Sequence, residues 1–320
     1  MTLKNKKRIK KLLLICGILL VLLNLLAYLH AYKFTHFSTK KIQRTGKPGD
    51  LSFLTKLSVL IFGVSNPKPK SDTLPDRPFE KIKIAARGNH KIDCWLVNVE
   101  KPKGTVILFH GYASSKSALL EESKVLTNLK YNTLLVDFYG HGESDGDQTS
   151  LGYHEALDVL AAYNYVEQSR EKGVIILFGT SMGAVAVLKA VSQYQLQPDA
   201  LILECPFSSL LKTVKNRFRI MNLPSFPFAE LLVFWGSVQN NFWGFSHNVV
   251  KYAKQIDIPT LLNYGLKDNC VDPDEIEDIF NQLRGYKDQK FFETCGHESY
   301  CKKEPAKWSK TIAPFLARKK

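Results

Sequence analysis

The sequence lacks the short motifs that would point to nucleotide-dependent or metal-dependent chemistry. Its six cysteines include no Cys-x-x-Cys pair, so a zinc site is not expected. The glycine-containing stretch 179–189 lacks the GxxxxGK[ST] pattern of a phosphate-binding loop. No internal repeat is present. We therefore predict a chain that needs no metal and no cofactor.

Acidic residues are almost missing from the first 70 residues, and this asymmetry accounts for the net charge of +14. That segment holds 14 lysines and arginines but one acid, Asp50, whereas the remaining residues hold 30 basic and 29 acidic side chains. A nucleic-acid-binding domain needs a basic stripe on its folded surface. The nearly neutral body supplies none, so we do not expect a nucleic-acid partner.

The basic N-terminus precedes an apolar run from Leu12 to Leu29, in which only Asn24 is strongly polar. As a helix with a rise of about 1.5 Å per residue, this run nearly spans a hydrocarbon core of about 30 Å. Basic flanks stay on the cytoplasmic side of a membrane. Residues 1–32 are therefore predicted to be a single-pass anchor, with the N-terminus cytoplasmic and the rest of the chain extracytoplasmic. A cleaved signal peptide and a buried helix are the alternatives.

Residues 33–80 are predicted to link the anchor to the folded body. Their distinctive feature is the apolar segment 51–64, LSFLTKLSVLIFGV, which is too short to span a membrane and contains Lys56. We expect this segment to pack on the domain, with a position on the membrane surface as the alternative. Proline-containing stretches at 66–69 and 74–78 then indicate an extended connector.

In residues 81–320, apolar strand-like runs alternate with stretches of helical spacing. The predicted strands are 81–86, 91–99, 105–109, 132–136, 174–178, 200–203, 260–264 and 290–293, and the predicted helices are 117–129, 153–169, 184–194, 274–283 and 305–316. This alternation predicts an α/β domain built on a mainly parallel eight-stranded sheet with helices on both faces. The aromatic-rich stretch 207–250 interrupts the alternation. We expect it to form a helical lid insertion over the site, with ordinary packing helices as the alternative.

The stretch GTSMG, residues 179–183, follows an apolar strand and opens a predicted helix. GxSxG alone is a weak signal, but this strand–turn–helix setting is what a nucleophile elbow requires. The glycines allow a sharp backbone turn, and the helix N-terminus favours developing negative charge. The setting predicts that Ser181 is a nucleophile rather than part of an ordinary turn.

A serine hydroxyl needs a base to accept its proton, and in elbow-type sites the base comes last in the chain. Of the eight histidines, only His297 follows the final predicted strand. The acid should lie between the serine and the histidine. Asp268, after strand 260–264, is the first candidate, and Glu204, at the end of the preceding strand, is the alternative.

Other polar residues around these strands have simpler interpretations. Asp272 and Asp274 are typical start signals for the helix that follows them.

Two backbone N–H groups are expected to bind an oxyanion, namely Met182 after the nucleophile and Tyr112 in the loop after strand 105–109. The Tyr112 phenol has two open roles, as a wall of the pocket or as a packed side chain.

Five ordered motifs carry a resemblance to a known family. They are His110-Gly111, DFYGHGES at 137–144, GTSMG at 179–183, GLKD at 265–268 and Gly296-His297. Together they resemble the α/β-hydrolase superfamily, in particular its serine-aminopeptidase-like, monoacylglycerol-lipase-like and Bem46-like hydrolases, including membrane-anchored bacterial members. The resemblance covers roughly residues 80–318. It implies a Ser181–Asp268–His297 triad with oxyanion donors at Tyr112 and Met182, and a 137–144 loop that shapes the floor of the site.

These features predict a membrane-anchored serine hydrolase that cleaves carboxylic esters, with an apolar acyl or lipid-like small molecule as substrate. A serine peptidase of aminopeptidase type and a thioesterase are the enzyme alternatives, and a non-catalytic binding scaffold is the alternative of a different class. The sequence indicates no protein partner. Cys270 and Cys295 flank the acid and base loops, so a disulfide between them is a further prediction, with small buried thiols as the alternative.

Overall fold

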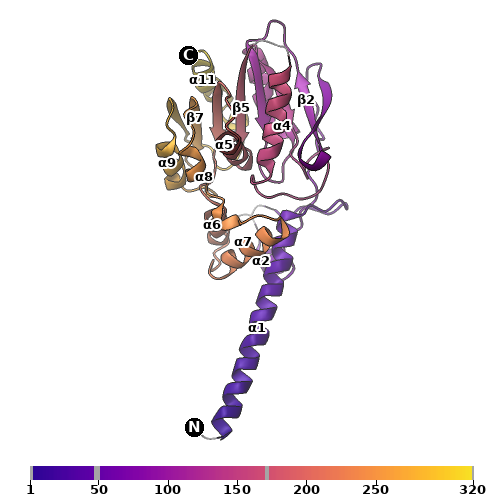
Figure 1. Ribbon diagram of the computed structural model, residues 1–320, viewed down its shortest axis with the longest axis vertical. Coiled ribbons are helices and arrows are strands. Elements are labelled where there is room, and N and C mark those ends of the chain that lie inside the picture. Colours follow the sequence, from indigo (N-terminus) through magenta and orange to yellow (C-terminus); the bar gives the residue numbers. More distant parts are fainter. Residues whose placement is uncertain (1–2, 47–50, 170–172, 319–320) are drawn as a thin grey trace.

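The computed structural model describes residues 3–46, 51–169 and 173–318 (Figure 1). Residues 1–2 of the predicted anchor, 47–50 of the predicted linker, and 170–172 and 319–320 of the predicted body lie outside the described residues.

Eight described strands form one sheet in the order β1-β2-β4-β3-β5-β6-β7-β8. The strands are β1 Glu80–Ala85, β2 Lys91–Val97, β3 Gly104–Phe109, β4 Asn132–Val136, β5 Val174–Thr180, β6 Ala200–Glu204, β7 Thr260–Gly265 and β8 Lys287–Phe292. β2 pairs antiparallel with β1 and with β4, and the other pairs are parallel. The predicted mainly parallel sheet is confirmed. β8 begins before the predicted 290–293 run because its first residues, KDQK, are polar and give no apolar signal.

Helices cover both faces of the sheet, as predicted. One face is covered by α4 Glu155–Gln168, α5 Met182–Tyr194, α8 Val249–Ala253 and α9 Pro273–Gln282, and the other by α3 Leu120–Asn128, α10 Tyr300–Lys303 and α11 Pro305–Leu316. β3 shows why both faces are apolar: Ile107 packs in the core on the α5 side, whereas Val106 and Leu108 pack in the core on the α11 side. A strand buried on both faces appears in sequence as a continuous apolar run.

Short 3₁₀ helices and further α-helices complete the body. The 3₁₀ helices are η2 Arg87–Asn89, η3 Lys116–Leu119 and η4 Gly244–Ser246. The stretch 207–250 contains α6 Leu210–Ile220 and α7 Phe228–Gln239 and lies between β6 and β7 in the chain. Asp272 caps α9 in a capping box with Glu275, which confirms its predicted role as a helix start signal.

The N-terminal helix α1 runs from Leu3 to Thr35 and is, among the described residues, the one helix long and apolar enough to cross a membrane. Figure 1 shows it projecting from the end of the molecule where α2 Phe53–Phe62, α6 and α7 lie. Its side chains from Lys4 to Leu22 are exposed, whereas Ala27, Ala31 and Thr35 are buried. α1 packs on α7, so its last turns belong to the folded body.

The segment after α1 is joined to the body by backbone pairing. His36 forms a bridge with Gln148, and Ser38 with Pro67. The Phe37 N–H donates to the Asp147 carbonyl at 2.6 Å. α2 itself contains no buried residue, although the Lys33 ammonium of α1 donates to its last carbonyl, that of Phe62, at 2.5 Å. The described part of residues 33–80 is therefore attached along the side of the body where α1 emerges.

Candidate active site

Ser181 stands between β5 and α5 in a backbone conformation that few L-residues adopt, with φ 52° and ψ −115°. Such a conformation costs about 1–3 kcal/mol and persists only where the surrounding structure imposes it. Here the two flanking glycines permit it. A Cβ at Gly179 would lie 2.6 Å from the Ala184 nitrogen, and one at Gly183 would lie 2.3 Å from the Phe109 carbonyl oxygen. The turn therefore requires both glycines of the motif and presents Ser181 at the carboxyl edge of the sheet.

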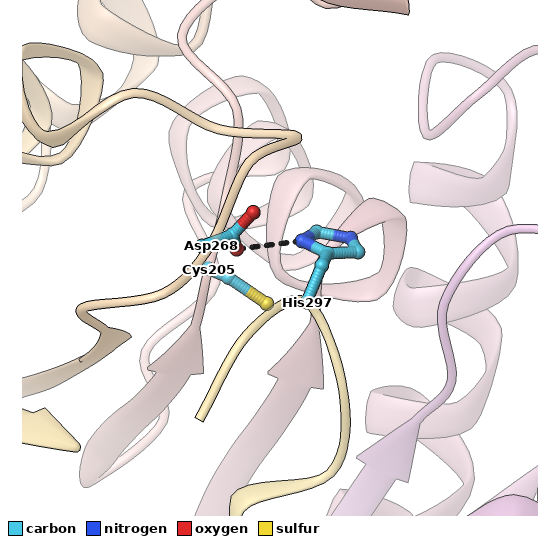
Figure 2. Close-up of side chains that lie close together, drawn as sticks. All are labelled: Cys205, Asp268 and His297. Carbon is cyan, nitrogen blue, oxygen red and sulfur yellow. Dashed lines mark hydrogen bonds and ion pairs between the residues drawn. The ribbon is translucent and has the colours of Figure 1, made fainter. Parts of the chain in front are cut away.

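Ser181, His297 and Asp268 form a continuous hydrogen-bonded chain. His297 Nε2 lies 2.9 Å from Ser181 Oγ, and His297 Nδ1 lies 2.7 Å from Asp268 Oδ2. Figure 2 shows the imidazole directed at the carboxylate. The other carboxylate oxygen, Oδ1, accepts from the N–H groups of Cys270 at 2.8 Å and Val271 at 3.1 Å, which fixes the aspartate in place. With Nδ1–H donated to the aspartate, Nε2 is free to accept the serine proton.

Cys205 completes the cluster and was not singled out by the sequence. Its sulfur and the donor atoms of Asp268 and His297 lie within 4.8 Å of one another (Figure 2). Burial first, and then the nearby Asp268 carboxylate, raises the pKa of the Cys205 thiol well above its ordinary value. A metal requires the thiolate, so this donor set fits a hydrogen-bonded triad better than a metal centre. The available signal was position, because Cys205 directly follows β6 at the carboxyl edge of the sheet.

Glu204, the alternative acid, is engaged elsewhere. Its Oε1 accepts from the Trp308 indole N–H at 2.7 Å and from the Asn263 amide at 3.2 Å. Burial, followed by repulsion from Glu122, raises the pKa of Glu204 to about 8. Glu204 is therefore bonded to Trp308 of α11 and Asn263 of β7, whereas His297 is bonded to Asp268.

The loop after β3 lies against Ser181. A Cβ placed on Gly111 would be 3.6 Å from the Ser181 Cβ, so the backbone of this loop passes close to Ser181. Met182 is the first residue of α5, where helix geometry leaves N–H groups without helical partners. The N–H groups of Tyr112 and Met182 stay the predicted oxyanion donors.

His110 braces this loop as a neutral imidazole. Its Nε2 accepts from the Phe138 N–H at 3.2 Å, so Nδ1 carries the proton and donates to the Gly111 carbonyl at 2.8 Å. Burial lowers the pKa of His110, which keeps the ring uncharged. The loop that carries Tyr112 is thereby held by two hydrogen bonds of His110 rather than by charge.

The Tyr112 phenol connects the same loop to α1, a contact that sequence reasoning missed. Its hydroxyl donates to the Phe34 carbonyl at 2.6 Å and accepts from the Asn66 amide at 2.7 Å. The tyrosine ring also stacks on the Phe34 ring, with centroids 4.9 Å apart. One residue further on, the Ala113 carbonyl accepts from the Arg44 guanidinium at 2.7 Å. The end of the apolar helix therefore supports the loop beside Ser181.

A pocket of about 730 Å³ opens over Ser181 and His297. Its walls come from α1, α2, α6 and α7 and are mostly apolar. Two guanidiniums, those of Arg44 and Arg217, also line it. Glu298 is the one acidic residue among its described lining residues, and its carboxylate is bonded to the Lys303 ammonium at 2.8 Å. The pocket therefore suits an apolar ligand with few polar groups.

The predicted disulfide between Cys270 and Cys295 is wrong, because the structure does not join these two residues. The two sulfurs have different partners. Cys270 Sγ accepts from the Arg217 guanidinium at 3.0 Å, whereas Cys295 Sγ donates to Glu304 at 3.4 Å. The acid and base loops are instead joined by the Asp268–His297 hydrogen bond.

Known proteins resemble the chain in both sequence and structure. Residues 100–235 match the family model described as serine aminopeptidase, S33. Protein bem46 of Schizosaccharomyces pombe is 25% identical over 285 residues, covering 83% of this chain and 88% of the relative. The lysophosphatidylserine lipase ABHD12 of Mus musculus is 26% identical over 132 residues, which are 39% of this chain and 33% of the relative. The Pyrococcus furiosus esterase Pf2001 superposes with a TM-score of 0.66 at 25% identity, covering 78% of this chain and 96% of the esterase.

Proposed function

The chain belongs to the α/β-hydrolase superfamily, and from that premise we propose that it is a membrane-anchored serine hydrolase that cleaves carboxylic esters of apolar acyl groups. One observation carries the proposal. The hydrogen-bonded chain from Ser181 through His297 to Asp268 lies at the floor of a largely apolar pocket. The esterase and lipase names of the similar proteins agree with this reaction class.

The geometry supports a two-step acyl transfer. Ser181 Oγ attacks the acyl carbonyl while its proton passes to His297 Nε2, and Asp268 stabilises the resulting imidazolium. The N–H groups of Met182 and Tyr112 hold the oxyanion of the tetrahedral intermediate. The C–O bond to the alcohol then breaks, and the leaving oxygen takes the proton from His297. A water molecule, deprotonated by His297, repeats the attack on the acyl-enzyme and releases the acid.

The substrate class follows from the pocket and from α1. The pocket's apolar walls favour an acyl chain, and an anchor formed by α1 would keep the enzyme at a lipid surface. We place the N-terminus of α1 in the cytoplasm because of its basic flank, and the catalytic domain on the opposite side. Segment 207–250 serves as the lid, because α6 and α7 form part of the pocket wall.

A lipid with an anionic head group is a second candidate, favoured by two side chains. Arg44 and Arg217 line the pocket, and none of the ion pairs in the described part of the chain involves either. A guanidinium binds a phosphate in bidentate fashion. A single-chain phospholipid would place its phosphate there, and Arg217→Gln would then weaken cleavage of lysophospholipids more than that of neutral monoacylglycerols.

The peptidase alternative receives less support from the pocket. An aminopeptidase needs a free acid to bind the substrate's ammonium group. The acidic residue on the described pocket wall, Glu298, is already bonded to Lys303. A thioesterase would use the same triad and the same acyl pocket, so the leaving group decides between it and an esterase.

A substrate panel tests the proposal. The full chain in detergent micelles is assayed with p-nitrophenyl esters of different chain length, an acyl thioester and aminoacyl anilides, beside Ser181→Ala. We expect ester cleavage that is lost in Ser181→Ala. Cleavage of anilides alone would support the peptidase, preference for the thioester would support a thioesterase, and no cleavage of any of them would support a binding scaffold.

A further inference from the structure

One face of α1 lines the pocket above the nucleophile. Leu26, Ala27, His30, Ala31 and Phe34 all border it. They recur every three or four residues and so lie on a single face of the helix. Ala27 and Ala31 are 5% and 3% exposed, whereas Leu29 on the other face is 49% exposed. The proposed anchor is therefore also a wall of the substrate site.

Asn24, the polar residue in the apolar run, helps to hold α1 in this position. Its side-chain oxygen accepts from the Trp235 indole N–H of α7 at 3.2 Å. A turn later, the Tyr28 ring meets the Trp235 ring edge to face, and the Tyr28 carbonyl accepts from Gln239 at 2.8 Å. These contacts fix α1 against α7 on the outer side of the pocket. The hydrogen bond to Trp235 explains why a polar residue, Asn24, stands within the apolar run from Leu12 to Leu29.

α2 and α7 supply further parts of the pocket wall. Val59 and Leu60 of α2 and Leu232 and Val233 of α7 border it. The walls approach closely at one point, because a Cβ on Gly236 would be 3.9 Å from the Ala31 Cβ. Small residues at 31 and 236 therefore let α1 and α7 approach closely at this border of the pocket.

The end of the molecule that carries these walls also exposes large apolar side chains. Phe53 and Phe62 of α2 are 79% and 66% exposed, and Phe226 and Trp243, on either side of α7, are 75% and 55% exposed. The helices α2 and α7 lie at the end of the molecule from which α1 projects (Figure 1). Large apolar groups gathered at such a place are typical of a membrane contact.

We propose that the acyl chain of a bilayer lipid enters between α1, α2 and α7 and lies along α1 to reach Ser181. This inference rests on the proposed ester hydrolysis and names where its substrate binds. The apolar end of the domain contacts the bilayer surface, so the lipid tail exchanges one apolar environment for another. Ala27 and Ala31 then limit the length of acyl chain that the site accepts.

A single bulky substitution tests the proposed acyl channel. Ala31→Trp, in the full chain in detergent micelles, is compared with Leu29→Trp, which adds the same ring to the exposed face of the same helix. The substrates are p-nitrophenyl butyrate and p-nitrophenyl palmitate. We expect Ala31→Trp to lower kcat/KM for the palmitate at least tenfold more than it lowers kcat/KM for the butyrate. Leu29→Trp should change neither.

An unchanged chain-length preference in Ala31→Trp would overturn the channel, and so would an equal loss on both esters in protein that still reacts fully with a small fluorophosphonate. If Ala31→Trp does not fold, Ala31→Leu takes its place and must show the same selectivity in milder form. Failure of ester hydrolysis itself is distinguishable, because native protein and Ser181→Ala would then be equally inactive on the butyrate.

Discussion

Two buried polar clusters lie at the carboxyl edge of the sheet, and they differ in what surrounds them. In one, the Lys116 ammonium lies 2.5 Å from Asp137 and 2.8 Å from Asp93, with no exposure of the lysine side chain. In the other, His297 joins Asp268 to Ser181, and the histidine side chain is 21% exposed to the pocket. Both clusters contain a buried carboxylate paired with a nitrogen base.

The difference is whether the charges are already satisfied. Asp137 also accepts from the N–H groups of Lys116 and Glu143, and although burial alone would raise the pKa of Asp137, Lys116 holds it below its ordinary value. That cluster is closed and ties the 137–144 loop to η3. In the triad, the chain of hydrogen bonds ends on a hydroxyl that faces the pocket. A cluster whose charges are all paired within the protein indicates a structural role. A hydrogen-bonded chain that ends on a hydroxyl facing a pocket indicates a reactive group.

Removing the nucleophile should give the largest effect. Ser181→Ala is expected to lower kcat for ester cleavage by about 10⁶-fold, the loss seen when one member of an interdependent triad is removed. The melting temperature should not fall, because the replaced hydroxyl has one hydrogen bond and is not packed in the core. Steady-state kinetics and thermal unfolding of the same preparations measure both.

Changing the triad acid should give the next largest effect. Asp268→Asn preserves the shape but not the charge, and kcat should fall by about 10⁴-fold because the imidazole loses the partner that orients it. Glu204→Gln is the matched control on the neighbouring strand and should retain activity within a factor of about two. Equal losses in the two variants would remove the distinction between these carboxylates.

Breaking the closed cluster should affect stability instead of rate. Lys116→Met leaves Asp137 and Asp93 buried without their cation and should lower the free energy of unfolding by about 3–5 kcal/mol. Activity per labelled active site should stay within tenfold of the native value. Denaturant unfolding, combined with titration of active sites, separates the two quantities. A large drop in rate with unchanged stability would contradict the structural role.

The last effect differs in kind, because Glu204 should make stability depend on pH. Its pKa is raised in the folded state from 4.5 to about 8, so the unfolded chain ionises first as pH rises. Stability from this group is full below pH 4.5 and is lost between pH 4.5 and about 8, with a slope of at most about 1.4 kcal/mol per pH unit. Glu204→Gln should flatten that decline in melting temperature. An unchanged pH profile would show that Glu204 ionises normally.

The sheet could be predicted because its signals are local, and signals of the same kind indicated the candidate elbow at 179–183 and the candidate base, His297. The apolar run before GTSMG and the position of His297 after the last strand need only a few neighbouring residues to be interpreted. β8 was placed late because its start is polar, and the disulfide was wrong because proximity of two loops does not direct their thiols toward each other. The contacts of Cys205, Lys116 and Tyr112 join distant segments, so no local pattern indicates them.

The position of α1 on the pocket wall is a second feature that the sequence alone could not predict. Hydrophobicity predicted a helix able to span a membrane, and one described helix has that length and composition. Its alanines at 27 and 31 carry no special signal in an apolar run. Their position on the pocket wall depends on how α7 packs against α1, which is a property of the folded chain.

The most direct measurement is the site of covalent labelling by a fluorophosphonate. Native protein is reacted with the probe, digested, and mapped by mass spectrometry, beside His297→Ala. Nucleophilic activation predicts one adduct, on Ser181, and loss of labelling when His297 is removed. An adduct on another residue, or undiminished labelling of Ser181 without His297, would contradict the triad.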